Sequence, residues 1–150
     1  MIIVRVPLRI SIAGGGTDLK SWYQDHGSMF ISGAINKYIY ITYHRSEFDP
    51  KIRVRYSKME EVDTVDELQH DIVRETFRAH GITDSVELTS HAEIPSGTGL
   101  GSSGSFGVGI IQAITGEIGD PAEVAREATR IQMDILRHPI GIQDQYAATY

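Results

Sequence analysis

Two short segments of the chain combine glycine with serine, threonine or aspartate, residue types suited to binding and transferring charged groups. They lie at residues 14–18 and 95–105. Nine of the 15 glycines fall at residues 14–16 and 97–109. Because glycine has no side chain, clustered glycines let the backbone come close to a bound molecule. We therefore treat these segments as the candidate binding and catalytic regions.

The second segment reads Pro-Ser-Gly-Thr-Gly-Leu-Gly-Ser-Ser-Gly-Ser and runs directly into an apolar stretch that begins at Phe106. Backbone N–H groups at the start of a helix point toward an anion, and serine hydroxyls bind phosphate oxygens or Mg²⁺. A flexible glycine and serine turn is the alternative. It is disfavoured because each glycine inside the first helical turns costs about 1 kcal/mol relative to alanine. The pattern indicates a phosphate-binding loop.

Two common phosphate-binding loops fit this segment poorly. A Walker A loop requires Lys and then Ser or Thr after its last glycine, whereas Ser105 and Phe106 follow Gly104. Residues 99–104 satisfy the dinucleotide fingerprint G-x-G-x-x-G, but that fingerprint needs a strand after its helix. Here the helix expected at 103–115 leads through residues 116–120 to another helix. The segment therefore fits a phosphate-binding loop that is neither a Walker A loop nor a dinucleotide-binding loop.

Hydrophobic periodicity predicts the elements that must position these segments. Thr64 with Glu67 and Asp120 with Glu123 have the spacing of capping boxes and mark two helix starts. The expected strands are 2–6, 8–13, 29–43, 51–57 and 85–94, and the expected helices are 19–26, 65–80, 103–115 and 121–137. Strands that come first and are then mixed with helices are typical of an α+β fold.

Composition excludes several classes of protein. The 150 residues suffice for one domain with its own core. The chain has no cysteine for a disulfide framework or a Cys-ligated metal, and no apolar run approaches the roughly 20 residues that span a bilayer. Its start lacks the features of a signal peptide, and a net charge of −6 disfavours nucleic-acid binding. We expect a cytoplasmic protein whose partners are small molecules, with no nucleic acid and no membrane.

The segment Pro95-x-x-x-Gly99-Leu-Gly-Ser-Ser-Gly-Ser105 resembles the central ATP-binding motif of the GHMP kinase family. Val6-Pro-Leu-Arg-Ile-Ser-Ile-Ala-Gly-Gly-Gly-Thr-Asp18 and Gly141-Ile-Gln-Asp-Gln-Tyr-Ala-Ala148 resemble two further motifs of the family, in the same order. The resemblance implies an α+β N-terminal domain like domain 2 of ribosomal protein S5, followed by a ferredoxin-like C-terminal domain. We expect residues 1–150 to be this N-terminal domain, as an incomplete part of a longer chain, with the C-terminal domain absent.

The same resemblance implies roles for single residues. Asp144 matches the catalytic aspartate and Arg9 the basic residue near it; a loop turn and a solvated strand face are the plain structural alternatives. Asp18 matches a ligand of sugar hydroxyls, alongside a role as a helix cap. The expected substrate-binding residues are Gly15, Gly16, Thr17 and Asp18. The expected ATP-binding residues are Pro95, Gly97, Gly99, Leu100, Gly101, Ser102, Ser103, Gly104 and Ser105.

The cofactors that the resemblance implies are ATP and Mg²⁺, and Ser103 matches the metal-contacting serine of the family. Gln132 departs from the family pattern, because it stands where these kinases usually have a glutamate ligand. A neutral amide is a poorer ligand for a hard cation. Asp134 is the nearby substitute, unless the ion is held mainly by ATP and Ser103.

Within the family, the Gly-Gly-Gly-Thr-Asp and Gln-Asp-Gln-Tyr-Ala-Ala motifs most resemble the heptose 7-phosphate kinases. This likeness predicts transfer of phosphate from ATP to the anomeric hydroxyl of D-glycero-D-manno-heptose 7-phosphate. Two alternatives stay open. One is another sugar-1-kinase, for fucose or galactose, and the other is a fragment that binds sugar or nucleotide without turnover.

Overall fold

The computed structural model describes residues 1–116 and 119–150, so the expected connection at 116–120 lies partly outside the described residues. The chain has the α+β fold that the sequence predicts. Its elements in chain order are β1 (Ile2–Ala13), α1 (Lys20–His26), β2 (Ile31–Arg45), β3 (Ile52–Arg55), β4 (Met59–Val62), the 3₁₀ turn η1 (Val65–Glu67), α2 (Asp71–Ala79), β5 (Val86–Ala92), α3 (Ser102–Thr115), α4 (Pro121–Thr129), the π-helical turn η2 (Arg130–Ile135) and α5 (Gln143–Thr149).

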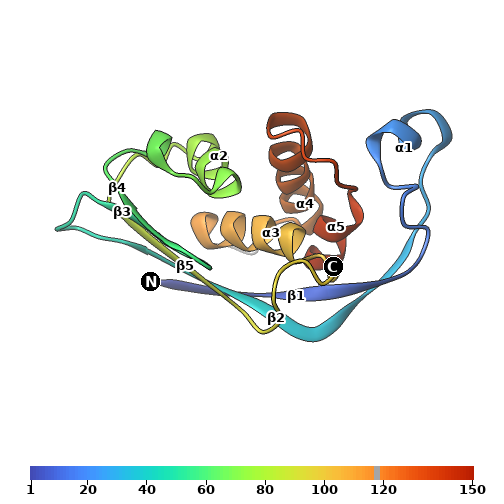
Figure 1. Cartoon of the computed structure of the whole chain (residues 1–150), viewed down its shortest axis with the longest axis horizontal. Coiled ribbons are helices and arrows are strands. Elements are labelled where there is room, and N and C mark those ends of the chain that lie inside the picture. Colours follow the sequence, from blue (N-terminus) through green and yellow to red (C-terminus); the bar gives the residue numbers. More distant parts are fainter. Residues whose placement is uncertain (117–118) are drawn as a thin grey trace.

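The described strands form one mixed sheet in the order β1-β2-β5-β3-β4. All neighbouring strands are antiparallel except β3 and β5, which are parallel. Helices α2, α3, α4 and α5 lie on one face of this sheet (Figure 1). Helix α1 stands apart from them at the end of β1 and has no buried residue.

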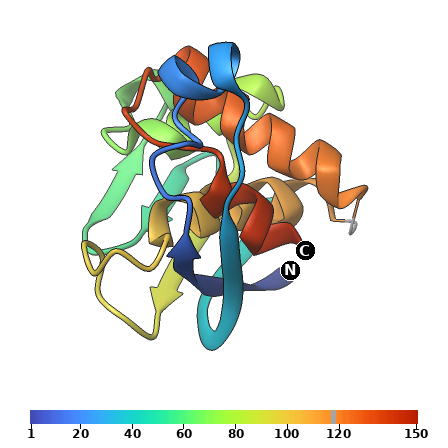
Figure 2. The same cartoon turned by 90° about the vertical axis from the view of Figure 1, so that its right-hand side faces the viewer.

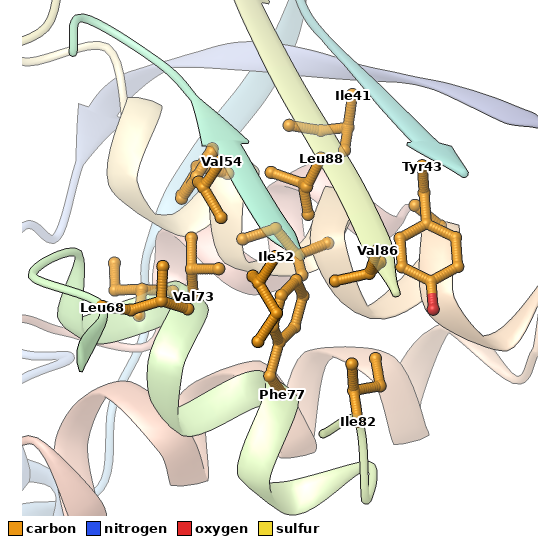
Figure 3. Packing of buried hydrophobic residues seen from close by; sticks show 14 of the residues in the cluster. Ile41, Tyr43, Ile52, Val54, Leu68, Val73, Phe77, Ile82, Val86 and Leu88 are labelled. Atoms are coloured by element: carbon orange, nitrogen blue, oxygen red, sulfur yellow. The ribbon is translucent and has the colours of Figure 1, made fainter. Parts of the chain in front are cut away.

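The main core lies between the sheet and α2 and α3. Apolar residues alternate along the strands and point toward the helices, as expected for a sheet with one wet face. From α2, Val73 and Phe77 pack against this strand face (Figure 3). The strand residues beneath them that are fully buried include Ile41, Ile52, Val54, Val86 and Leu88.

Several elements differ from the sequence prediction. Glu67 does not help to cap a helix; its carboxylate accepts from the Thr64 hydroxyl (3.0 Å), the chain makes a 3₁₀ turn, and α2 starts only at Asp71. The helix expected at 121–137 changes to a π-helical turn after Thr129. Strand β4 and helix α5 were not predicted. No helix in the described part of the chain is long and apolar enough to cross a membrane.

Candidate active site

An ion pair joins the first strand to the last described helix. The Nε of Arg9 donates to Oδ1 of Asp144 (2.7 Å), and Nη2 lies 2.5 Å from the same oxygen. Nη1 donates to the carbonyl oxygen of Gly99 (2.5 Å). The Arg9 side chain is 10% exposed and that of Asp144 is 22% exposed. No group in the described ranges bonds Oδ2 of Asp144, so this oxygen is left for a ligand.

A break in strand register turns Arg9 toward the helices. Pro7 pairs with Tyr38 and Arg9 with Ala34, so β2 contains two extra residues at this point. In a regular strand successive side chains point to opposite faces, yet Leu8 and Arg9 are both buried. The backbone N–H of Arg9 also donates to the carbonyl of Leu100 (3.0 Å). The irregularity therefore fixes Arg9 against the glycine loop through main chain and side chain.

Helix α3 begins where the glycine loop meets Asp144. Gly101 precedes the helix with φ of 76°, and a Cβ there would lie 3.2 Å from Cγ of Asp144. A Cβ at Gly104 would overlap with the Asp144 side chain. Gly97 and Gly99 also have positive φ, a conformation that glycine adopts without strain. The glycines of this loop therefore allow Asp144 to pack directly on the first turn of α3.

Two of the three serines at the start of α3 present hydroxyls to a ligand. Ser102 and Ser103 line a pocket, and their hydroxyls have no partner within the described residues. The first N–H groups of a helix also lack intrahelical partners, so this turn can bind phosphate. Ser105 differs, because it is fully buried and its hydroxyl donates to the carbonyl of Pro7 (2.8 Å). Its side chain links α3 to β1, so this hydroxyl is directed at the protein and not at a ligand.

The pocket beside the glycine loop has a volume of about 630 Å³, within the usual range for small-molecule sites. Pro95 and the two serines form its loop side. Its apolar side comes from the sheet, α2 and α3. The apolar residues are Ile39, Ile72, Ile94 and Phe106. A nucleotide base fits a pocket of this size and polarity when its phosphates lie on the adjoining loop.

Two pocket residues, Tyr56 and His70, were not predicted from the sequence. The His70 ring lies 4.6 Å from the ring of Tyr56 and 4.9 Å from that of Phe106. Burial lowers the pKa of His70, although the carboxylates of Asp71 and Glu60 act in the opposite direction. The imidazole is therefore neutral at pH 7. No motif could have identified it, because a single histidine before a helix carries no pattern.

The turn at residues 14–18 is held by its own polar groups. The Thr17 hydroxyl donates to the carbonyls of Gly14 (2.8 Å) and Met29 (3.1 Å). A Cβ at Gly14 would overlap with the Met29 carbonyl, so only glycine fits. Around Gly16, with φ of 95°, there is open space. Thr17 thus stabilises the turn, while Gly15 and Gly16 leave its backbone accessible.

Asp18 connects this turn to the segment at residues 141–145, which precedes and contains Asp144. It is 3% exposed, and its carboxylate accepts from the N–H of Gly16 (2.9 Å) and of Gln143 (3.3 Å). A Cβ at Gly141 would overlap with the same carboxylate. The alternative role as a helix cap is wrong, since Leu19 occupies the N-cap of α1. Asp18 thus fixes the chain one residue before Asp144.

Oxygen donors suitable for Mg²⁺ are few at this site. The described residues contain no group of three or more His, Cys, Asp or Glu side chains that could hold a metal. Mg²⁺ needs only one or two protein ligands when phosphates and water supply the rest. The hydroxyl of Ser103 fits an ion of that kind, with phosphate oxygens as the further ligands. Gln132 is fully buried, Asp134 pairs with Lys20 (2.5 Å), and neither side chain lines the pocket.

Comparison with known proteins identifies the family. The model of the GHMP kinases N terminal domain matches residues 67–150, which is more than half of the chain. The chain therefore belongs to the GHMP kinase family and has the fold of its N-terminal domain.

Two proteins similar to this chain are kinases of heptose phosphates. The chain is 30% identical to D-glycero-alpha-D-manno-heptose 7-phosphate kinase of Campylobacter jejuni, an alignment that covers 99% of this chain and 48% of that protein. A D-glycero-D-manno-heptose 1-phosphate kinase from Bacteroides thetaiotaomicron matches with a TM-score of 0.87 and 25% identity, over 100% of this chain and 54% of that one. The chain thus spans about half the length of these relatives.

A third similar structure is the phosphomevalonate kinase of Streptococcus pneumoniae in complex with phosphomevalonate and AMPPNP. It matches with a TM-score of 0.76 and 19% identity, over 99% of this chain and 47% of that one. At this identity the likeness shows the shared fold alone.

Proposed function

We propose that this chain is the N-terminal part of an ATP-dependent sugar kinase that phosphorylates the anomeric hydroxyl of D-glycero-D-manno-heptose 7-phosphate. The observation that carries the proposal is the Arg9–Asp144 ion pair against the first turn of α3, between the glycine loop and the Asp18 turn. The likeness to heptose phosphate kinases supports the substrate.

The reaction requires a proton acceptor and a site for phosphate charge. Oδ2 of Asp144 accepts the proton of the anomeric hydroxyl, which is more acidic than an ordinary alcohol. The sugar oxygen forms a bond to the γ-phosphorus, the bond to the β–γ bridging oxygen breaks, and ADP leaves. Arg9 carries positive charge beside this reaction and holds the carboxylate in place. The sugar 1,7-bisphosphate and the proton on Asp144 are the immediate products.

The nucleotide lies across the glycine loop in this proposal. The base occupies the 630 Å³ pocket, and the phosphates accept from the N–H groups and hydroxyls of Ser102 and Ser103. Ser103 would hold Mg²⁺ together with the phosphates, and the ion would supply neutralisation of the phosphate charge. The sugar lies against Gly15 and Gly16, where the turn leaves backbone accessible.

The test is a coupled assay of ADP release by the full-length protein with ATP, Mg²⁺ and a panel of sugars and sugar phosphates. We expect turnover with D-glycero-D-manno-heptose 7-phosphate, and we expect NMR to place the new phosphate on C1. Turnover with galactose or fucose but not with the heptose phosphate would reject the substrate. Binding of sugar or nucleotide without ADP release from any sugar would favour the non-catalytic alternative.

A further inference from the structure

Gln132 is a polar side chain with no contact with solvent. It lies in the π-helical turn η2 and is 0% exposed. Its Nε2 donates to the carbonyl of Ser103 (3.5 Å), and its amide group lies 3.4 Å from the amide group of Gln145. A buried amide costs free energy unless its polar atoms find partners. These two contacts are therefore the partners that make its burial tolerable.

The neighbouring helix is shaped to admit this amide. A Cβ at Gly107 of α3 would overlap with Nε2 of Gln132. The backbone carbonyl of Gln132 is fixed as well, because it accepts from the N–H of His138 (2.9 Å). Single π-turns within helices are frequent at functional sites. The side chain is thus held from both ends, with its amide pressed on the backbone of α3.

The two partners of Gln132 belong to different parts of the candidate site. Ser103 lies in the first turn of α3, where the phosphates are proposed to bind. Gln145 is also 0% exposed and follows Asp144 directly on α5. The Gln145 amide donates either to Oε1 of Gln132 or, with its oxygen and nitrogen exchanged, to the carbonyls of Gly141 (3.2 Å) and Ile142 (3.1 Å); in both orientations the two glutamine amides are in contact. Gln132 therefore bridges the phosphate-binding turn and the segment that carries the catalytic carboxylate.

We propose that Gln132 is a positioning residue for phosphoryl transfer, which fixes the first turn of α3 relative to Asp144. This inference rests on the proposed function. Gln132 touches neither nucleotide nor metal in this role, since it is fully buried and does not line the pocket. A displacement of about 1 Å in a reacting pair can cost about 100-fold in rate, so a buried bridge of this kind bears directly on kcat.

The test compares Gln132→Met with wild type in the full-length protein. Methionine keeps the length of the side chain and removes both amide contacts. We expect kcat to fall by about 10- to 100-fold while both KM values stay within about threefold. Thr76→Val is the matched control, because it removes a buried hydrogen bond of α2 (Thr76 hydroxyl to the Ile72 carbonyl, 2.6 Å) and its side chain does not line the pocket. We expect its kcat to be that of wild type.

Two further variants separate positioning from a general structural role. Gly107→Ala places a methyl group where the Gln132 amide lies, so it should lower kcat on its own. In the Asp144→Asn background, Gln132→Met should cause little further loss. An unchanged kcat in Gln132→Met, or full additivity with Asp144→Asn, would overturn the proposal. A higher kcat and a lower Mg²⁺ requirement in Gln132→Glu would do the same, because they would make position 132 a metal-ligand site.

Hydrogen exchange distinguishes failure of this inference from failure of the proposed function. Gln132→Met should raise amide exchange in residues 102–105, whereas Thr76→Val should not. Absence of sugar phosphorylation by the wild type would reject the proposed function and, with it, the catalytic part of this inference. Unchanged exchange at residues 102–105 in a wild type that does phosphorylate sugar would reject this inference alone.

Discussion

At the scale of single residues, Asp144 has one carboxylate oxygen bound to protein and one that is open. Both nitrogens of Arg9 that reach it contact Oδ1. Arg9 is itself held by the carbonyls of Gly99 and Leu100, so the pair cannot move without the glycine loop. A general base needs a lone pair directed at the proton that it accepts, and Oδ2 can supply it.

Replacement of Asp144 by asparagine tests this role. The amide keeps the shape of the carboxylate but is a far weaker base, so kcat for sugar phosphorylation should fall by at least about 100-fold. The matched control is Asp134→Asn, because Asp134 is half exposed and pairs with Lys20. It should retain wild-type kcat. Steady-state kinetics of the full-length variants measures both, and a loss below tenfold in Asp144→Asn would remove Asp144 from the role of base.

Part of this site was predictable from the sequence and part was not. The glycine and serine pattern at residues 95–105 predicts a phosphate loop on local chemistry alone. The inward position of Arg9 depends on the break in register with β2, which alternation within β1 cannot reveal. The inward side chain of Ser105 depends on a contact with a distant residue, Pro7. A serine in a loop motif looks alike in sequence whether it faces a ligand or a neighbouring strand.

At the scale of elements, α3 and α5 contact each other at Gly104 of α3. The side chain of Asp144 occupies the space that a Cβ at Gly104 would need, and the backbone of Gln145 lies 3.2 Å from that point. Nine of the 14 residues of helix α3 are buried, including Val108 and Ile111. The helix is therefore fixed in the core while its first turn is open to the pocket.

Substitution of Gly104 by alanine tests this contact. The methyl group would force Asp144 away from α3, so kcat should fall by more than tenfold, and overpacking should cost about 1–3 kcal/mol of stability. Gly33→Ala is the control, because a Cβ at Gly33 has no heavy atom within 4 Å. Kinetics and thermal melts measure the two effects. An active Gly104→Ala variant with normal kcat would show that the close packing of Asp144 is not needed.

The elements that the sequence did not predict are those that depend on tertiary contacts. Strand β4 contains two glutamates, which are poor strand formers, yet it pairs with β3, and Glu61 accepts from Arg53 (2.8 Å). Helix α5 has seven residues and little apolar periodicity, and it forms where it packs on α3, α4 and β1. The long helix α3 was predicted within one residue, because a run of apolar residues is a local signal.

At the scale of the whole molecule, the topology brings residues 14–18, 95–105 and 141–145 close to one another. Figure 2 views the molecule from the end where α1 lies, and α5 is seen there in front of α3. The α+β class followed from the order of strands and helices. The strand order could not be predicted, because each pairing depends on contacts between distant parts of the chain.

His70 lines the pocket, and its protonation affects the stability of the whole fold. Its Nδ1 is buried without a hydrogen bond, and the nearest carboxylate oxygen, from Asp71, lies 3.9 Å away. The other oxygen of Asp71 lies 2.8 Å from Nε2 of His138. Glu60 binds the backbone N–H of His70 and the hydroxyl of Tyr56. These are the charged and titratable groups that face the imidazole, and burial still lowers its pKa below the usual 6.5.

This shift predicts a loss of stability in acid. As pH falls below about 6.5, the unfolded chain protonates His70 before the folded protein does, so the unfolded state binds more protons and the free energy of unfolding decreases. His70→Gln removes the titrating group, and its stability should fall less between pH 7.5 and 5.5 than that of wild type. His44→Gln, which replaces an exposed histidine of β2, is the control and should follow wild type. Chemical denaturation at both pH values measures the difference, and an equal fall in His70→Gln and wild type would contradict the assignment of this acid sensitivity to His70.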